Sequence, residues 1–253
     1  GSKEHNIVMR QRAIDRGLRL SEFGLIPEAE AGELKGMAAA HLSLPAIDES
    51  EIYRHLELDW VPPELREDTG EIAAAQDESL PRLIVPSDVK GALHNHTTLS
   101  DGDATLEQMA DAARNIGWNW LGVADHSPTL KVANGASAED LLAQGEQIKQ
   151  YNKNWQEQGV DFKLFHGVES DILEGGKLDH PDEVLAELDY VVASVHAMTK
   201  WKNRDEVTNT EELIRCIDHP ATTILGHPTG RILQGRDGYE VDMFAIIEHM
   251  AEH

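Results

Sequence analysis

The sequence of 253 residues holds a single cysteine, Cys216. One cysteine excludes an internal disulfide and a thiolate-rich zinc site, so any metal ion must be held by histidines and carboxylates. A chain without disulfides suits a reducing compartment, and we expect the protein to be cytoplasmic. Long apolar runs are absent too. None approaches the ~18 residues of a membrane-spanning helix, so we expect no membrane contact.

Positive charge is also scarce. The chain has 22 Lys and Arg against 46 Asp and Glu, a net charge of −24. This balance argues against the broad basic surface of a sequence-independent DNA-binding protein. Residues 1–20 are the exception, because five basic residues stand there against Glu4 and Asp15. The acidity either serves solubility or is neutralised in part by divalent metal ions, and the composition leaves both interpretations open.

The first third of the chain contains short elements. Asp48, with Glu51 three residues later, forms the capping-box pattern that opens a helix. The polar residues 69–88 include two prolines and indicate a linker, so we expect one unit at 1–68 and another at 89–253. The elements expected before the linker are a helix over 3–17, a hairpin over 17–26 and a helix over 48–58.

From residue 89 onward, short apolar runs alternate with helical patterns. Strict alternation of strand and helix predicts an α/β fold in which helices connect the strands of a parallel sheet. The β-branched runs fit strands that are buried on both faces. Strands are expected over 89–94, 118–125, 160–169, 188–196 and 221–228, and helices over 104–117, 137–159, 180–187, 209–217 and 241–253.

Each expected strand ends in a potential metal ligand. In "GALHNHTTLSDGD", alternation along a strand places His94 and His96 on the same face, and Asp101 follows on the next loop. Side chains at the carboxyl ends of parallel strands converge on one face of a barrel, which is where such folds carry out chemistry. The candidate metal ligands are His94, His96, Asp101, His126, Glu169, His196 and His227.

This ligand set favours hydrolysis of phosphate esters. Imidazoles and carboxylates suit Zn²⁺, Mn²⁺ or Fe²⁺, and more than four ligands imply more than one ion. Glu169 is the candidate to bridge two ions. Neighbouring ions can activate water and stabilise the leaving oxygen of a phosphoester. An amidohydrolase would use a similar set, but usually with a lysine at a strand end, and none stands there. We place the catalytic centre at His94, His96, Glu169 and His196.

Several nearby residues have two interpretations. Asp125 either orients His126 or is itself a ligand, and we favour His126 because adjacent strand residues face opposite sides. Arg231, in "GHPTGR", either binds a phosphate oxygen or is a solvated loop residue. Lys200 and Lys202 have the same two interpretations.

Five ordered motifs resemble those of the PHP (polymerase and histidinol phosphatase) domain family: "LHNHTTLSDG", "GVADHS", "GVESDI", "ASVHAM" and "GHPTGR". The resemblance implies a distorted seven-stranded β/α barrel, a (β/α)7-type fold of which this chain holds about five units. Upstream, "GSKEHNIVMRQRAIDRGLRLSEFGLI" and "EIYRHLELDWVPPELRED" are similar to the thumb subdomain of family X polymerases, a small α+β unit. The combination is similar to bacterial DNA polymerase X.

The resemblance also implies a function and a metal stoichiometry. It suggests a metal-dependent 3′–5′ exonuclease that acts on DNA ends in repair, with up to three Mn²⁺, Zn²⁺ or Fe²⁺ ions. DNA phosphates would be contacted by Arg10 and Arg12 on the first helix, without reading of sequence. By this resemblance, His94 and His96 hold the first metal, Glu169 bridges to the second, His196 and His227 complete the second, and Asp101 and His126 hold the third.

Two parts of the family pattern are missing from the sequence. The family expects two further strands ending in an Asp-x-His motif, and a polymerase palm with catalytic aspartates before the thumb. We therefore expect a fragment without polymerase activity that binds the second metal best and hydrolyses slowly. An incomplete barrel is also expected to expose apolar strand edges.

Two other functions remain open from the sequence. One is a phosphomonoesterase similar to histidinol-phosphate phosphatase, against which the thumb-like region argues. The other is a non-catalytic DNA-binding module in which the metal ions only stabilise the fold.

Overall fold

The computed structural model describes residues 1–252, and the chain divides into two compact units, Gly1–Ile84 and Val85–His253. Helix α4, Glu71–Gln76, lies in the range predicted as a linker. Its Ala75 is buried in the core of the first unit. The expected helix over 241–253 extends one residue beyond the described part of the chain. Each unit is described separately below.

The first unit combines helices with a two-stranded sheet. Strands β1 and β2 form an antiparallel hairpin that pairs Leu18 with Pro27 and Ser21 with Gly24, as the glycine-bounded segment predicts. The elements are α1 Lys3–Asp15, β1 Leu18–Ser21, β2 Gly24–Pro27, α2 Glu28–Ala31, the 3₁₀ helix Gly36–Leu42, α3 Glu49–His55, the 3₁₀ helix Pro63–Leu65, and α4.

Asp48 is the N-cap of α3, as the sequence predicts. Its carboxylate accepts hydrogen bonds from the backbone amides of Ser50 and Glu51, which an α-helix leaves unsatisfied in its first turn. The Glu51 carboxylate accepts from the amide of Ile47 rather than from that of Asp48, so the reciprocal bond reaches one residue further back than in a capping box.

A buried hydrogen bond between two side chains connects α1 with α4. His5 Nδ1 lies 2.6 Å from Glu71 Oε1, and His5 Nε2 lies 3.0 Å from the Tyr53 hydroxyl. The Glu71 carboxylate also accepts from the amides of Asp68 and Thr69. Burial raises the pKa of Glu71, but these hydrogen bonds outweigh it and lower the pKa to about 2. The pair therefore holds the start of α4 against α1 while Glu71 is ionised.

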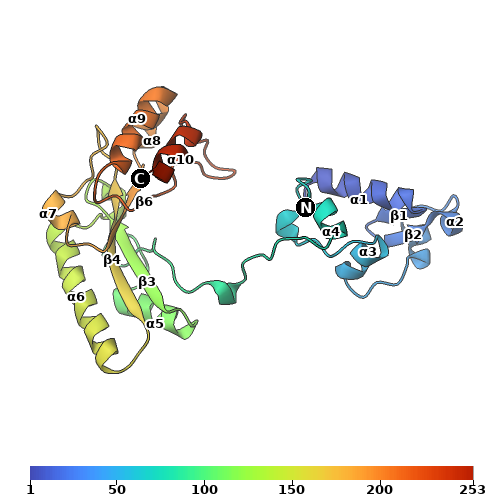
Figure 1. Ribbon diagram of the computed structural model, residues 1–253, viewed down its shortest axis with the longest axis horizontal. Helices are drawn as coiled ribbons and strands as arrows, with labels where there is room; N and C mark the ends of the chain where they lie inside the picture. The colour runs from blue at the N-terminus through green and yellow to red at the C-terminus, as the bar shows by residue number, and fades with distance from the viewer. Residues whose placement is uncertain (253) are drawn as a thin grey trace. The chain divides into compact units, whose positions relative to one another are not determined.

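The second unit is built on a parallel sheet (Figure 1). Its strands are β3 Trp120–His126, β4 Lys163–Asp171, β5 Tyr190–Ser194 and β6 Ile224–Leu225, in the order β3-β4-β5-β6. Its α-helices are α5 Leu106–Asn115, α6 Ala138–Glu157, α7 Asp182–Leu185, α8 Met198–Lys202, α9 Glu206–Ile217 and α10 Met243–Glu252, with 3₁₀ turns at Pro86–Asp88 and Lys131–Ala133. The α/β class and the strand–helix alternation are confirmed.

The sheet has a helix-covered face and an inner face. Leu121, Val123 and Leu164 pack with the apolar side chains of α5 and α6 in one buried cluster. Ala124 and Tyr190 belong to a second cluster on the other side of the strands. Because side chains alternate along a strand, this pattern also separates the polar residues at the strand ends into two sets.

The prediction of a strand over 89–94 is wrong, because the segment does not form a regular strand. The segment does run beside β3, because the amides of Gly122 and Ala124 donate to the carbonyls of Ala92 and Asn95. The Asn95 side chain donates to the carbonyl of Gly122, where a regular ladder would use a backbone amide, and the Tyr190 hydroxyl donates to Leu93 O. Hydrogen bonds from side chains therefore replace part of the backbone hydrogen-bond ladder that a regular strand would form.

Among residues 1–252, no helix has both the length and the apolar character that crossing a membrane would require.

Glu71→Gln tests the buried pair of the first unit. The pKa of Glu71 is about 2 in the fold against an ordinary value of 4.5, so the ionised carboxylate stabilises the unit above pH 4.5. That contribution is lost as the pH falls from 4.5 through about 2. We expect E71Q to lower the free energy of unfolding of this unit by ~3 kcal/mol at pH 7, and by progressively less in acid.

Hydrogen exchange of the α1 and α3 amides measures this loss locally. The matched control is Glu67→Gln, because Glu67 is exposed in the loop before α4. Equal effects of the two substitutions, or a loss that does not change with pH, would contradict the assignment.

Candidate metal centre

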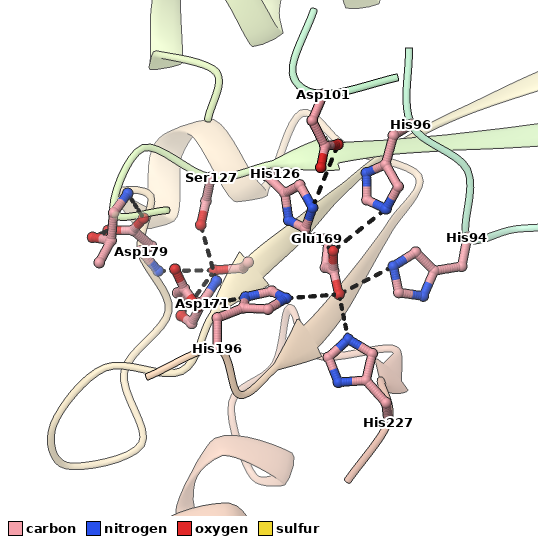
Figure 2. A network of polar contacts seen from close by, with 12 residues as sticks. His94, His96, Asp101, His126, Ser127, Glu169, Asp171, Asp179, His196 and His227 are labelled. Atoms are coloured by element: carbon pink, nitrogen blue, oxygen red, sulfur yellow. Dashed lines mark hydrogen bonds and ion pairs between the residues drawn. The ribbon is translucent and has the colours of Figure 1, made fainter. Parts of the chain in front are cut away.

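The seven predicted ligands lie together, with the Glu169 carboxylate at their centre (Figure 2). Oε1 lies 3.1 Å from His94 Nε2, 3.4 Å from His196 Nε2 and 2.9 Å from His227 Nε2. Oε2 lies 3.6 Å from His96 Nε2 and 2.8 Å from His126 Nδ1. Asp101 joins through its Oδ1, which lies 3.6 Å from His126 Nε2.

The parallel sheet explains this convergence. In the register of β3 and β4, His126 pairs directly with Glu169, so both side chains point to the inner face. His196 follows the end of β5 by two residues, and His227 follows β6 in the same way. His227 has a φ of 24°, a left-handed conformation that is uncommon for a residue with a side chain. Such conformations cluster at functional sites.

The spacing of these atoms fits shared metal ions. Ligands bound at about 2.0–2.2 Å in a tetrahedral arrangement lie about 3.3–3.6 Å from one another. The Glu169 oxygens lie 2.8–3.6 Å from the imidazole nitrogens, so the nearest pairs would separate by a few tenths of an ångström around a bound ion. Three groups have ligand atoms that all lie within 4.8 Å of one another: His94–His96–Glu169, His96–Asp101–His126, and His126–Glu169–His196. His126 Nδ1 is buried and makes no well-aligned hydrogen bond within residues 1–252, although Glu169 is near. A buried imidazole nitrogen that lies near a carboxylate without an aligned hydrogen bond suits a cation held by both groups.

The centre has a buried floor and a more open rim. The Glu169 side chain is 1% exposed, whereas that of His94 is 34% exposed and that of His227 is 45% exposed. The imidazoles and Glu169 line a pocket of about 520 Å³. Burial raises the pKa of Glu169, but contact with the surrounding imidazoles lowers it well below its usual range. The carboxylate is therefore ionised and ready to coordinate a cation at neutral pH.

Asp125 faces away from the pocket. Its fully buried carboxylate accepts hydrogen bonds from the amide and hydroxyl of Thr97, from the Ser100 hydroxyl and from Gln144 Nε2 of α6. Of the two interpretations left open, neither describes this role. Asp125 fixes the loop that carries His96 and Asp101, while His126 turns to the inner face as the strand alternation predicts.

Asp171 is a member of the site that sequence reasoning missed. It is buried, and its Oδ1 lies 2.7 Å from His196 Nδ1 (Figure 2). Burial lowers the pKa of His196, but the hydrogen bonds to Asp171 and Glu169 raise it to about 9. The signal was present in "GVESDI", because Asp171 stands two residues after Glu169 on the same strand face. A carboxylate on the second nitrogen of a ligating imidazole fixes its orientation.

The predicted cationic residues are not part of the cluster. Arg231 is exposed, and its backbone amide donates to Thr229 Oγ1. Lys200 pairs with Glu174 at 3.3 Å, and Lys202 is exposed. None of the three lines the pocket. Their roles in phosphate binding remain predictions.

Arg10 and Arg12 lie on α1 of the first unit and differ in their surroundings. Arg12 donates to the carbonyls of Leu56 and Glu57 and to Gln76 Oε1, and so secures the ends of neighbouring helices. Arg10 is exposed and makes no hydrogen bond or ion pair within the described part of the chain. Contact of either with DNA remains a prediction, and Arg10 is the one free to make it.

Comparison with protein families divides the chain at a similar place. The model of the DNA polymerase beta thumb matches residues 1–67, and that of the PHP domain matches residues 92–253.

Curated relatives of two kinds match. The chain is 40% identical over 248 residues to the DNA polymerase/3′-5′ exonuclease PolX of Bacillus subtilis (strain 168), covering 98% of this chain and 40% of that protein. It is 31% identical over 163 residues to a probable phosphatase of Clostridium acetobutylicum, covering 63% of this chain and 59% of that protein. A probable phosphatase of Clostridium botulinum is 33% identical over 138 residues, which are 53% of this chain and 51% of the relative. The chain thus spans about two fifths of the PolX relative.

Asp171→Asn tests the hydrogen bond to His196. Without the carboxylate, the imidazole loses its fixed orientation and part of its basicity, so we expect divalent metal affinity to fall ~10–100-fold. Calorimetric titration with Mn²⁺ and with Zn²⁺ measures this directly. Asp182→Asn is the control, because the Asp182 side chain is 86% exposed and lies outside the cluster. Unchanged affinity in D171N would remove Asp171 from the site.

Proposed function

The chain belongs to the PHP domain family, and from that membership we propose that its metal centre hydrolyses phosphodiester bonds of DNA as a 3′–5′ exonuclease. The observation that carries the proposal is the buried Glu169 carboxylate, which five imidazoles approach within 3.6 Å. The name of the PolX relative, which includes 3′-5′ exonuclease, and the thumb match before the PHP domain support DNA as the substrate.

We propose divalent ions as the cofactors, with Mn²⁺ or Zn²⁺ first, Fe²⁺ as a further candidate, and up to three ions in the site. Bound ions would polarise phosphate oxygens and supply an activated water for attack on phosphorus. Imidazoles and carboxylates without a thiolate are donors that suit these metals.

The residues of the chain contribute orientation and charge. Glu169 offers an oxygen to each half of the cluster, His94, His196 and His227 on one side and His96 and His126 on the other. Asp171 holds the His196 ring so that Nε2 faces Glu169. Preorganised groups of this kind add no reorganisation cost when charge develops on the phosphate.

We propose that DNA is contacted through its phosphates by the first unit. Arg10 is exposed on α1, and sequence-independent binding rests on such phosphate contacts. Two other arginines of the segment are engaged, since Arg16 pairs with Glu57 and Arg19 with Glu28. DNA contact by α1 would therefore depend on few cations, and binding should be weak at physiological salt.

A phosphomonoesterase is the second candidate, favoured by the relatives named as probable phosphatases. Those matches cover 63% and 53% of the chain, whereas the PolX match covers 98% of it and so includes the thumb. A non-catalytic, metal-stabilised DNA-binding module is the third candidate. It predicts DNA binding without cleavage.

Glu169→Gln separates these candidates. Replacing the central carboxylate leaves the imidazoles without their shared anion, so we expect Mn²⁺-dependent cleavage of a 3′-recessed duplex to fall at least ~100-fold. Turnover is expected to be slow, so rates are compared with those of the exposed control Glu183→Gln. p-Nitrophenyl phosphate is assayed in parallel. Faster hydrolysis of this monoester than of the duplex supports the phosphatase, and undiminished cleavage by E169Q contradicts both catalytic candidates.

Arg10→Ala tests the DNA contact. Loss of one phosphate contact should weaken duplex binding several-fold and reduce the slope of log affinity against log salt by about 1. Fluorescence anisotropy at several salt concentrations measures both quantities. The control is Arg54→Ala on α3, because the Arg54 side chain is 71% exposed but paired with Glu51. An unchanged slope for R10A would exclude a phosphate contact by this residue.

A further inference from the structure

We propose that Leu130 is a specificity-determining residue, which packs against the sugar and base of the nucleotide whose phosphate is bound at the metal centre. The inference rests on the proposed phosphodiesterase function and adds to it the part of the substrate that the pocket recognises. It arises from a residue that the chemistry of metal binding leaves unexplained.

Leu130 is the apolar member of the pocket wall among the described residues. The other lining residues are the candidate ligands His94, His96, His126, Glu169, His196 and His227. Leu130 is half-buried, so part of its side chain remains available to a ligand. A centre that bound only a phosphate group would interact with it through ions and polar side chains, and an apolar side chain at this position would add no contact to the phosphate.

The loop that carries Leu130 is fixed at both ends. The Thr129 amide and hydroxyl both donate to the Asp179 carboxylate, each at 2.7 Å. The Ser127 amide donates to the carbonyl of Glu169, and the Ser127 hydroxyl accepts from the amide of Asp171. The Ser127 bonds tie the start of the loop to β4, the strand that carries the central carboxylate, and the Thr129 bonds tie it to the segment after β4.

Gly135 closes the same loop. A side chain at Gly135 would place a Cβ 1.9 Å from the carbonyl oxygen of Ser127, so only glycine permits this close approach. The Gly135 amide donates to the carbonyl of Leu130, which fixes the position of Leu130 in turn. A wall that is already ordered loses little conformational entropy when a ligand packs against it.

The chemistry of a nucleotide fits this arrangement. The phosphate of a diester suits the ions and imidazoles, while the C–H faces of the deoxyribose and the base gain from contact with an apolar side chain. A small alkyl group on the phosphate would contact much less of the Leu130 side chain. Leu130 should therefore favour nucleoside esters over simple alkyl esters, without affecting the hydrolytic step itself.

Two chromogenic diesters with the same leaving group test the proposal on the full chain. They are thymidine 5′-(p-nitrophenyl phosphate) and methyl p-nitrophenyl phosphate, both assayed with Mn²⁺. For Leu130→Ser we expect kcat/KM to fall about tenfold on the thymidine ester, mainly through KM, and to stay within about twofold on the methyl ester. Leu130→Ile, which conserves volume, should retain most of the preference.

Val132→Ser is the matched control. Val132 lies two residues further along the same loop but is 91% exposed and does not line the pocket. We expect V132S to behave as the unaltered chain on both esters. Thermal melts and Mn²⁺ titrations of each variant show whether the fold and the centre are intact.

Each outcome is decisive. A selective loss on the thymidine ester supports the proposal, whereas equal losses on both esters, or none on either, overturn it. Hydrolysis of neither ester by an unaltered chain that does hydrolyse p-nitrophenyl phosphate would refute the proposed phosphodiesterase function, and the inference with it.

Discussion

The structure of the second unit depends on one buried carboxylate. Glu169 is almost fully removed from water, and a charge in that position is costly unless other groups compensate it. Five imidazoles surround it, and an imidazole in its neutral form also offers a nitrogen lone pair that needs a partner. Divalent cations satisfy both requirements, because they balance the carboxylate and accept the lone pairs.

The fold places these groups through strand alternation and through the buried carboxylate of Asp125. Odd and even positions at the end of β3 serve different purposes, since Asp125 faces α6 while His126 faces Glu169. Asp125 secures the loop after the irregular segment that carries His94 and His96. Four neutral donors satisfy it, so it makes no demand for a cation. The metal-binding face and the helix-packed face are thus separated within two consecutive residues.

From the sequence, the metal ligands could be predicted better than the residues that surround and orient them. Ligands at the ends of parallel strands converge by geometry alone, so His126 and Glu169 could be placed together from their positions in the pattern. Asp171 could have been found by the same alternation. Leu130 could not, because nothing in a loop sequence fixes the direction of a side chain. Tertiary bonds from Thr129 to Asp179 decide its place, and these join residues fifty positions apart.

The first strand shows a different limit. Apolar residues over 89–94 gave a strand pattern, yet side chains of Asn95 and Tyr190 occupy hydrogen-bonding positions of the backbone ladder. A pattern of apolar residues predicts that a segment is buried. A segment can be buried beside a sheet without forming a full ladder of backbone hydrogen bonds. In the first unit, by contrast, local signals sufficed for two elements, although they missed α4. The cap at Asp48 and the glycine-bounded hairpin are short-range features that tertiary contacts did not override.

Anomalous scattering from a crystal grown with Mn²⁺ tests most directly whether a metal ion binds at Glu169. We predict anomalous density within about 2.2 Å of a Glu169 carboxylate oxygen, with imidazole nitrogens of the cluster completing the coordination. A crystal saturated with Mn²⁺ that shows no density beside Glu169, with the imidazoles hydrogen-bonded to that carboxylate instead, would contradict it.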